Sequence, residues 1–180
     1  MTEVSLFLPL WQEYISQFLI YNLAFNKMEE PQFVHNKEEY PPMHSAEHIL
    51  NRTMVNIYGC PRSVENHIER KKSKCHYMID HDLTQAEVDE ITRRVNDVIN
   101  SHVDVRFEMV TEDQIPADVS RASLPAGADT FRLVYIGDYD VCLCVGAHVK
   151  NTSEIGEFRI TSHSYSDGKL RIVFKLDEAK

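Results

Sequence analysis

Two pairs of residues in this sequence have the types and the spacing of metal ligands. His44 and His48 lie four residues apart in a stretch with helical periodicity, so both imidazoles leave one face of a helix, about 6 Å apart at Cβ. Cys144 and His148, in the segment CVGAH, repeat this one-turn spacing. Three imidazoles and one thiolate form a mixed nitrogen and sulfur set that suits tetrahedral Zn²⁺. The four residues together predict a zinc site.

The segments around these residues resemble a known family. HSAEHIL (44–50), CVGAHVKNTSEIGEFRI (144–160) and GKLRIVF (168–174) are similar, in this order, to the editing domain of alanyl-tRNA synthetases and to its free-standing relatives, the AlaX trans-editing proteins. A similar domain occurs in threonyl-tRNA synthetases. The resemblance covers residues 43 to about 176.

The resemblance implies hydrolysis of the ester that joins a wrongly attached amino acid, typically serine or glycine, to the terminal ribose of alanine-specific tRNA. It also implies that His44, His48, Cys144 and His148 hold the zinc. A metal can polarise the ester carbonyl, position the amino acid or lower the pKa of its bound water. If all four residues bind at once, catalysis needs either a loose ligand, with Cys144 as the first candidate, or an expanded coordination. The sequence leaves both alternatives open.

Two positions in the second motif depart from the family pattern. Where the family usually has CGGTH, this chain has Val145 and Ala147, which bears on amino-acid selectivity. The departures keep open a second hypothesis, a non-catalytic module of the same fold that binds tRNA or metal. A third hypothesis is a zinc peptidase, because residues 44–48 also fit HxxEH with Glu47 as the general base. The CxxxH motif, which supplies the remaining ligands here, weighs against the peptidase.

Charge patterning bears on the partner. The 180 residues include 19 Lys+Arg and 28 Asp+Glu, a formal net charge of −9, which excludes a general nucleic-acid-coating protein. The densest basic run is Arg70, Lys71, Lys72 and Lys74, at the tip of a predicted hairpin. There it can meet tRNA phosphates, and a solvated turn is the alternative.

The cysteines bear on the compartment. The 4 Cys do not form the dense framework of a small secreted protein, so we expect reduced thiols and a cytoplasmic location. Cys60, Cys75 and Cys142 are predicted to be small buried hydrophobes, although Cys142 lies close enough in sequence to Cys144 to substitute for it. At least four of the five histidines outside the two motifs are expected to have no role, and these five are His67, His76, His81, His102 and His163.

The N-terminal region lies outside the resemblance. Its apolar start lacks a basic segment and contains polar residues, so it predicts neither a signal peptide nor a membrane span. An amphipathic helix is predicted from the spacing of Leu10, Tyr14, Phe18 and Tyr21, and we expect it to pack on the domain or to pair two chains in a homodimer. Residues 26–42 are charged and contain three prolines, as in a linker. We therefore expect a helix and linker over 1–42 and an editing-domain-like region over 43–180.

Periodicity and turn residues predict the elements that position the site. Helices are expected over 44–58 and from the capping box Thr84–Glu87 to about Ser101. The predicted strands are a hairpin over 64–70 and 74–80, then 103–110, 131–137, 157–166 and 169–176, with a loop-rich crossover over 111–130. This order of elements predicts an α+β fold with a mostly antiparallel sheet and packed helices.

Overall fold

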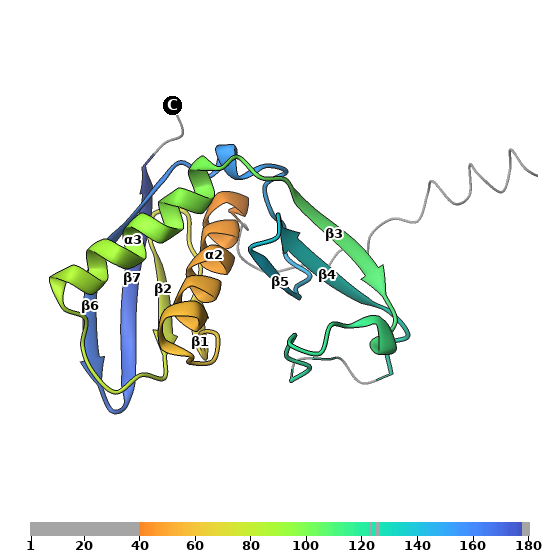
Figure 1. Ribbon diagram of the computed structural model, residues 1–180, viewed down its shortest axis with the longest axis horizontal. Helices are drawn as coiled ribbons and strands as arrows, with labels where there is room; N and C mark the ends of the chain where they lie inside the picture. Colours follow the sequence, from red (N-terminus) through yellow and green to blue (C-terminus); the bar gives the residue numbers. More distant parts are fainter. Residues whose placement is uncertain (1–39, 123, 125–126, 178–180) are drawn as a thin grey trace, which may run out of the picture. The chain divides into compact units, whose positions relative to one another are not determined.

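The computed structural model describes residues 40–122, 124 and 127–177, and its elements are labelled as in Figure 1. The predicted N-terminal helix and most of the predicted linker lie outside the described residues. The described part contains two α-helices and two antiparallel sheets, so the predicted α+β fold class is confirmed. The strands form two sheets where the sequence suggested one.

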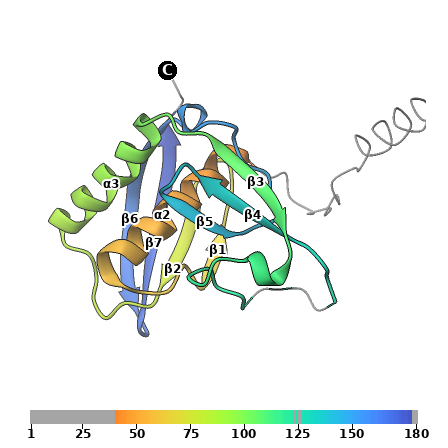
Figure 2. The same ribbon diagram turned by 45° about the vertical axis from the view of Figure 1, so that its right-hand side comes forward.

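Helix α2 (Pro41–Tyr58) is the element around which the described part is built. Its two prolines occupy the first turn, where no intrahelical N–H is needed, so the helix begins three residues before the predicted start. Gly59 ends it in the left-handed conformation (φ 64°), and its N–H donates to the Val55 carbonyl. Most of its residues are buried, and Figures 1 and 2 show the helix against the four-stranded sheet.

The larger sheet has the strand order β1 (Glu65–His67), β2 (Ser73–Tyr77), β7 (Lys169–Asp177), β6 (Glu157–Ser166), with every neighbouring pair antiparallel. The β1–β2 hairpin confirms the predicted one, with shorter strands. Asp167 (φ 53°) and Gly168 (φ 76°) connect β6 to β7, and positive φ at both residues is the geometry of a tight type I′ hairpin turn.

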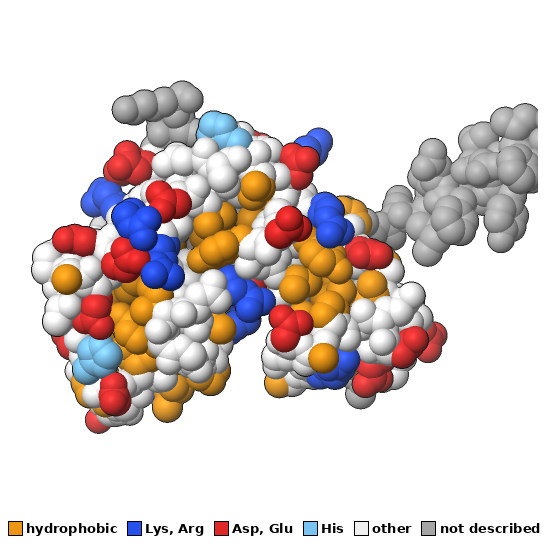
Figure 3. All heavy atoms as spheres, viewed as in Figure 1, with side chains coloured by type: hydrophobic (Ala, Val, Ile, Leu, Met, Phe, Trp, Pro, Cys, Tyr) orange, Lys and Arg blue, Asp and Glu red, His pale blue; other side chains and the backbone are white. Residues whose placement is uncertain are grey.

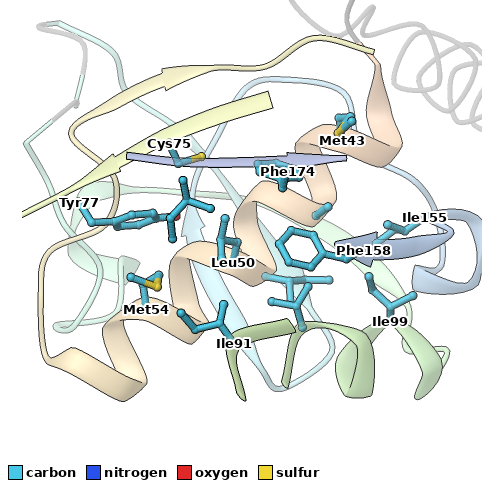
Figure 4. Packing of buried hydrophobic residues seen from close by; sticks show 14 of the residues in the cluster. Met43, Leu50, Met54, Cys75, Tyr77, Ile91, Ile99, Ile155, Phe158 and Phe174 are labelled. Atoms are coloured by element: carbon cyan, nitrogen blue, oxygen red, sulfur yellow. The ribbon is translucent and has the colours of Figure 1, made fainter. Parts of the chain in front are cut away.

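Helix α3 (Gln85–Asn100) begins at the predicted capping box, in which the Thr84 side chain and Glu87 each accept from the other's backbone N–H. Its apolar face packs on the same side of the sheet as α2. Figure 4 shows this core, in which Leu50 of α2 lies among Phe158 and Phe174 from the sheet and Ile91 from α3. Burial of these side chains fixes the position of α2, and with it the position of the first two candidate ligands.

The smaller sheet has the order β3 (Val105–Val110), β4 (Phe131–Ile136), β5 (Asp140–Leu143), again antiparallel. One face covers a small second core under the crossover 111–130, and the described residues of this crossover include the short 3₁₀ helix η1 (Glu112–Gln114). A second 3₁₀ turn, η2 (Thr152–Glu154), precedes β6. Among the described residues, no helix is both long and apolar enough to cross a membrane.

Candidate metal centre

The two predicted ligand pairs meet where α2 lies beside the end of β5. Helix α2 supplies His44 and His48, and the loop after β5 supplies Cys144 and His148, about one hundred residues later in the chain. Each of the four residues offers a ligand atom within 4.8 Å of the others. The structure thus brings all four predicted residues together, although the segments come from distant parts of the sequence.

The separations within this cluster fit a tetrahedral ion. The Cys144 Sγ lies 3.4 Å from His44 Nε2 and 3.5 Å from His148 Nε2. Tetrahedral Zn²⁺ with its usual bond lengths places a thiolate sulfur and an imidazole nitrogen about 3.6 Å apart. The His48 and His148 ring centroids are 4.4 Å apart. A soft sulfur and three imidazoles at these separations could hold a metal ion.

Ser45 orients the imidazole of His148. Its hydroxyl lies 3.1 Å from His148 Nδ1 and accepts from the Val149 backbone N–H at 3.2 Å. With the proton on Nδ1 donated to this hydroxyl, the lone pair of His148 is on Nε2, the nitrogen beside Cys144. The partner comes from α2, so the helix that carries two candidate ligands also orients a third.

A second group of side chains lies behind His48. Its Nδ1 is 3.3 Å from Cys142 Sγ and 3.7 Å from Asp140 Oδ2. Cys142 was predicted to be an inert buried hydrophobe, but it is half-buried and contacts a candidate ligand. The physical reason is its place on β5, two residues before Cys144, because alternate residues of a strand share one face. Cys60 and Cys75 are buried, as predicted.

Asp140 is the anionic centre of this second group. Its side chain is fully buried and accepts from Arg52 Nε at 2.9 Å and from both terminal nitrogens of Arg62, at 2.7 and 3.1 Å. The two guanidiniums neutralise the carboxylate, and Asp140 in turn raises the pKa of Arg62. The group therefore joins α2, the loop before β1 and strand β5 behind the candidate ligands.

Two imidazoles of the cluster, those of His48 and His148, are held in their neutral form. Burial lowers the pKa of His48 well below its usual value, with His148 and Arg62 as further causes. Burial also lowers the pKa of His148, followed by the charges of His44 and Arg132. A neutral imidazole has the lone pair that a metal requires, so at pH 7 these two side chains need no deprotonation before binding.

Glu47, the residue required by the peptidase hypothesis, is part of a buried polar network. Its Oε1 accepts from the side-chain amides of Asn51 and Asn66, the latter at 2.6 Å. Only 4% of the residue is exposed, and burial raises its pKa to about 7, partly opposed by Arg62. The carboxyl group is thus engaged by amide donors from α2 and β1, and its Oε2 lies 3.9 Å from His48 Nε2.

The raised pKa of Glu47 predicts a pH-dependent stability. Its carboxyl has a pKa near 7 when folded and near 4.5 when unfolded, so between these values folding takes up a proton. The stabilisation that protonation of Glu47 contributes is complete below pH 4.5 and is lost as the pH rises through 7. We expect the free energy of unfolding to decrease by about 3 kcal/mol over this range. Urea unfolding of metal-free protein across this range should show the decrease in wild type and its absence in Glu47→Gln. Equal slopes for both proteins would contradict the assignment.

The predicted basic run lies at the β1–β2 hairpin. Arg70, Lys71 and Lys72 are exposed in the connection, and the Arg70 guanidinium lies 5.0 Å from the centre of the Tyr40 ring. Lys74 is half-buried within β2, opposite Val173 of β7. Three of the four cations are therefore accessible to an anionic partner.

Two residues of the site escaped the sequence reasoning. Ser45 and Asp140 touch the candidate ligands, yet neither belongs to a recognisable motif. For Asp140 a signal exists, because residues 140, 142 and 144 alternate on one strand face and lead to Cys144. Three of the histidines outside the two motifs bond acidic side chains: His67 with Glu69, His81 with Glu87, and His163 with Asp82.

A family model and several known proteins resemble this chain. Residues 131–173, from β4 to β7, match the family model of the threonyl and alanyl tRNA synthetase second additional domain. The alanine–tRNA ligase of Thermoanaerobacter sp. (strain X514) is 32% identical over 139 residues, which is 71% of this chain and 15% of the relative. The alanine–tRNA ligase of Halalkalibacterium halodurans is 33% identical over 129 residues, 67% of this chain and 14% of the relative.

These findings define the class of the domain. The chain carries a domain of the editing type related to alanyl-tRNA synthetases, as the sequence motifs predicted. It spans about 15% of the length of the curated relatives that it matches. Within this domain, a cluster of histidine and cysteine side chains has the arrangement of a metal site.

Proposed function

We propose that this protein hydrolyses mischarged aminoacyl-tRNA, as a zinc-dependent trans-editing deacylase that acts in the cytoplasm. The observation that carries the proposal is the convergence of His44, His48, Cys144 and His148 at tetrahedral separations, in a domain related to the editing domain of alanyl-tRNA synthetases. Zinc, when bound there, would polarise the ester carbonyl or lower the pKa of a water molecule.

The chain's own residues would hold the ion and leave one ligand able to move. His48 is oriented by Cys142 and Asp140, and His148 by Ser45. Cys144 lies on the loop after β5 and is half-buried, so this ligand is our candidate for the one that loosens to admit the substrate. The neutral imidazoles would remain in place while the thiolate moves.

The residues that depart from the family pattern lie at the surface of the ligand loop. Val145 is 57% exposed and Ala147 is exposed, whereas Gly146 between them is buried and its carbonyl accepts from Arg132 Nη1 at 2.8 Å. The loop is thus anchored through Gly146, and the exposed side chain of Val145 is available to contact a substrate. We propose serine or glycine on alanine-specific tRNA as the substrates, and these departures favour a non-catalytic module as the second candidate.

Deacylation assays test this proposal directly. Wild-type protein of measured zinc content should release serine from serine-charged alanine tRNA, and should leave alanine-charged tRNA intact. If the protein instead releases an amino acid from mischarged threonine-specific tRNA, the proposed substrate would change and the proposed reaction would stand. Bound zinc without release of any amino acid would overturn the deacylase and support the binding module.

The exposed hairpin cations predict how tRNA binding depends on salt. Lys71→Ala with Lys72→Ala is expected to weaken binding of uncharged tRNA and to reduce the slope of log K against log salt by roughly 1 to 2. The matched control removes two exposed cations from α3, Arg93→Ala with Arg94→Ala, and should leave the slope unchanged. Fluorescence anisotropy over a salt series gives both slopes. If both double variants change the slope by the same amount, the hairpin cations have no specific contact with tRNA and the hairpin is a solvated turn.

A further inference from the structure

The three-stranded sheet exposes apolar side chains on the face that carries the candidate metal cluster. Strand register places Phe107 opposite Val134, and Val134 opposite Cys142, so these three side chains share one face. Phe107 and Met109 on this face are 51% and 52% exposed. Figure 3 shows hydrophobic side chains at the surface over this sheet. Exposed large apolar side chains that adjoin one another are a feature of ligand-binding surfaces.

Arg132 lies between the exposed side chains of Phe107 and Met109, here called the apolar strip, and the candidate metal cluster. It lies opposite Met109 in the sheet, and its carbonyl accepts from the Cys144 N–H at 3.1 Å. Its guanidinium carbon is 4.5 Å from the centre of the Phe107 ring. The Nε of Arg132 is buried and has no hydrogen-bond partner among the described residues. In the part of the chain that the structure describes, no carboxylate lies within ion-pair distance of the Arg132 guanidinium.

The strip and the cluster are close enough to contact one ligand. Phe107 and Cys142 are two strand spacings apart, roughly 10 Å between backbones. Arg132 is also joined to the loop that carries Cys144 and His148, because its Nη1 donates to the Gly146 carbonyl at 2.8 Å. An exposed ring, an unneutralised guanidinium and the cluster therefore follow one another across one face.

The chemistry of this face selects an unpaired nucleotide over an apolar peptide. Aromatic rings beside guanidinium groups are what unpaired bases stack on, and the positive charge attracts the adjoining phosphate. Such a local charge matters in a chain of net charge −9, which repels nucleic acid elsewhere. An apolar protein segment would gain nothing from the charge.

We propose that Phe107, supported by Arg132, forms a stacking platform for the unpaired base at the 3′ end of tRNA. This inference rests on the proposed function, since an ester on the terminal ribose must reach the cluster while the base of that same nucleotide lies beside it. Phe107 is a positioning residue in this arrangement. The platform selects for a free 3′ end, and the cluster acts on what that end carries.

A short RNA that ends in CCA, with 2-aminopurine in place of the last base, tests the platform without any hydrolysis. Stacking on the Phe107 ring should quench the fluorescence of the terminal base in zinc-loaded wild type. Phe107→Leu keeps an apolar side chain without the ring, and we expect affinity about 10-fold weaker with the quenching lost. Tyr165→Leu, which removes another exposed aromatic ring on β6, should behave as wild type.

The outcomes separate the platform from the deacylase. Loss of quenching in Phe107→Leu alone supports the platform, even if wild type fails to hydrolyse mischarged tRNA, which would refute only the proposed function. Equal binding by Phe107→Leu and wild type, or equal binding of an RNA whose last nucleotide is abasic, overturns the platform. So does a wild-type dimer that dissociates in Phe107→Leu, because the strip would then be an interface between two chains.

Discussion

Replacement of His48 with alanine is expected to reduce bound zinc from about one per chain to less than about 0.1, and to slow release of serine from mischarged tRNA about 100-fold or more. His48 is the most buried of the four candidate ligands, and its Nδ1 contacts Cys142 and Asp140. A metal contributes several kcal/mol of transition-state stabilisation, and each 1.4 kcal/mol changes the rate tenfold. Metal content is measured by elemental analysis and activity by release of labelled serine, at matched protein concentration.

A second variant separates loss of the metal from loss of the fold. His48 is buried, so Cys144→Ser, at a half-buried position, should lose metal and activity while circular dichroism stays that of wild type. The matched control is His163→Ala on β6, which removes a histidine outside the cluster and should change neither readout. Full activity in a His48→Ala protein shown to be free of zinc would refute the metal-dependent mechanism.

The second large effect is expected from Asp140→Asn, which should lower the free energy of unfolding by about 3 kcal/mol. The substitution leaves Arg52 and Arg62 facing a neutral amide where a fully buried carboxylate accepted three hydrogen bonds. The value is at the lower end of what a broken buried ion pair costs, because the two arginine side chains keep 20% and 26% exposure. Urea unfolding with an unchanged m-value measures the effect.

The same substitution should also weaken zinc binding by about 10- to 100-fold, because Asp140 helps to orient His48. Asp138→Asn, two residues earlier and exposed, is the control, and we expect a change of less than about 0.5 kcal/mol with unaltered zinc affinity. If Asp140→Asn loses less than about 1 kcal/mol, the ion-pair group does not hold α2 to β5 as we infer.

The helices and hairpins of this fold were predictable because their signals are local. A capping box starts α3 at the predicted residue, and Asp167-Gly168 closes the β6–β7 hairpin, whereas α2 begins three residues early, at two prolines that were predicted to belong to the linker. Each of these depends on residues within one or two turns of the chain. The division into two sheets was not predictable from the strand patterns, because pairing of distant strands depends on packing that no local signal describes.

For the site, residue types and one-turn spacing predicted both pairs of candidate ligands, and the resemblance of the surrounding segments to a known family predicted the class of the domain. Only the tertiary structure brought His44 and His48 against Cys144 and His148, placed Cys142 and Asp140 behind His48, and left Phe107 exposed. Spacing along a helix determines which side chains share a face, because 3.6 residues make a turn. Which elements that face meets is decided by burial of the core around α2 and by the register of β3, β4 and β5, and both are properties of the folded chain as a whole.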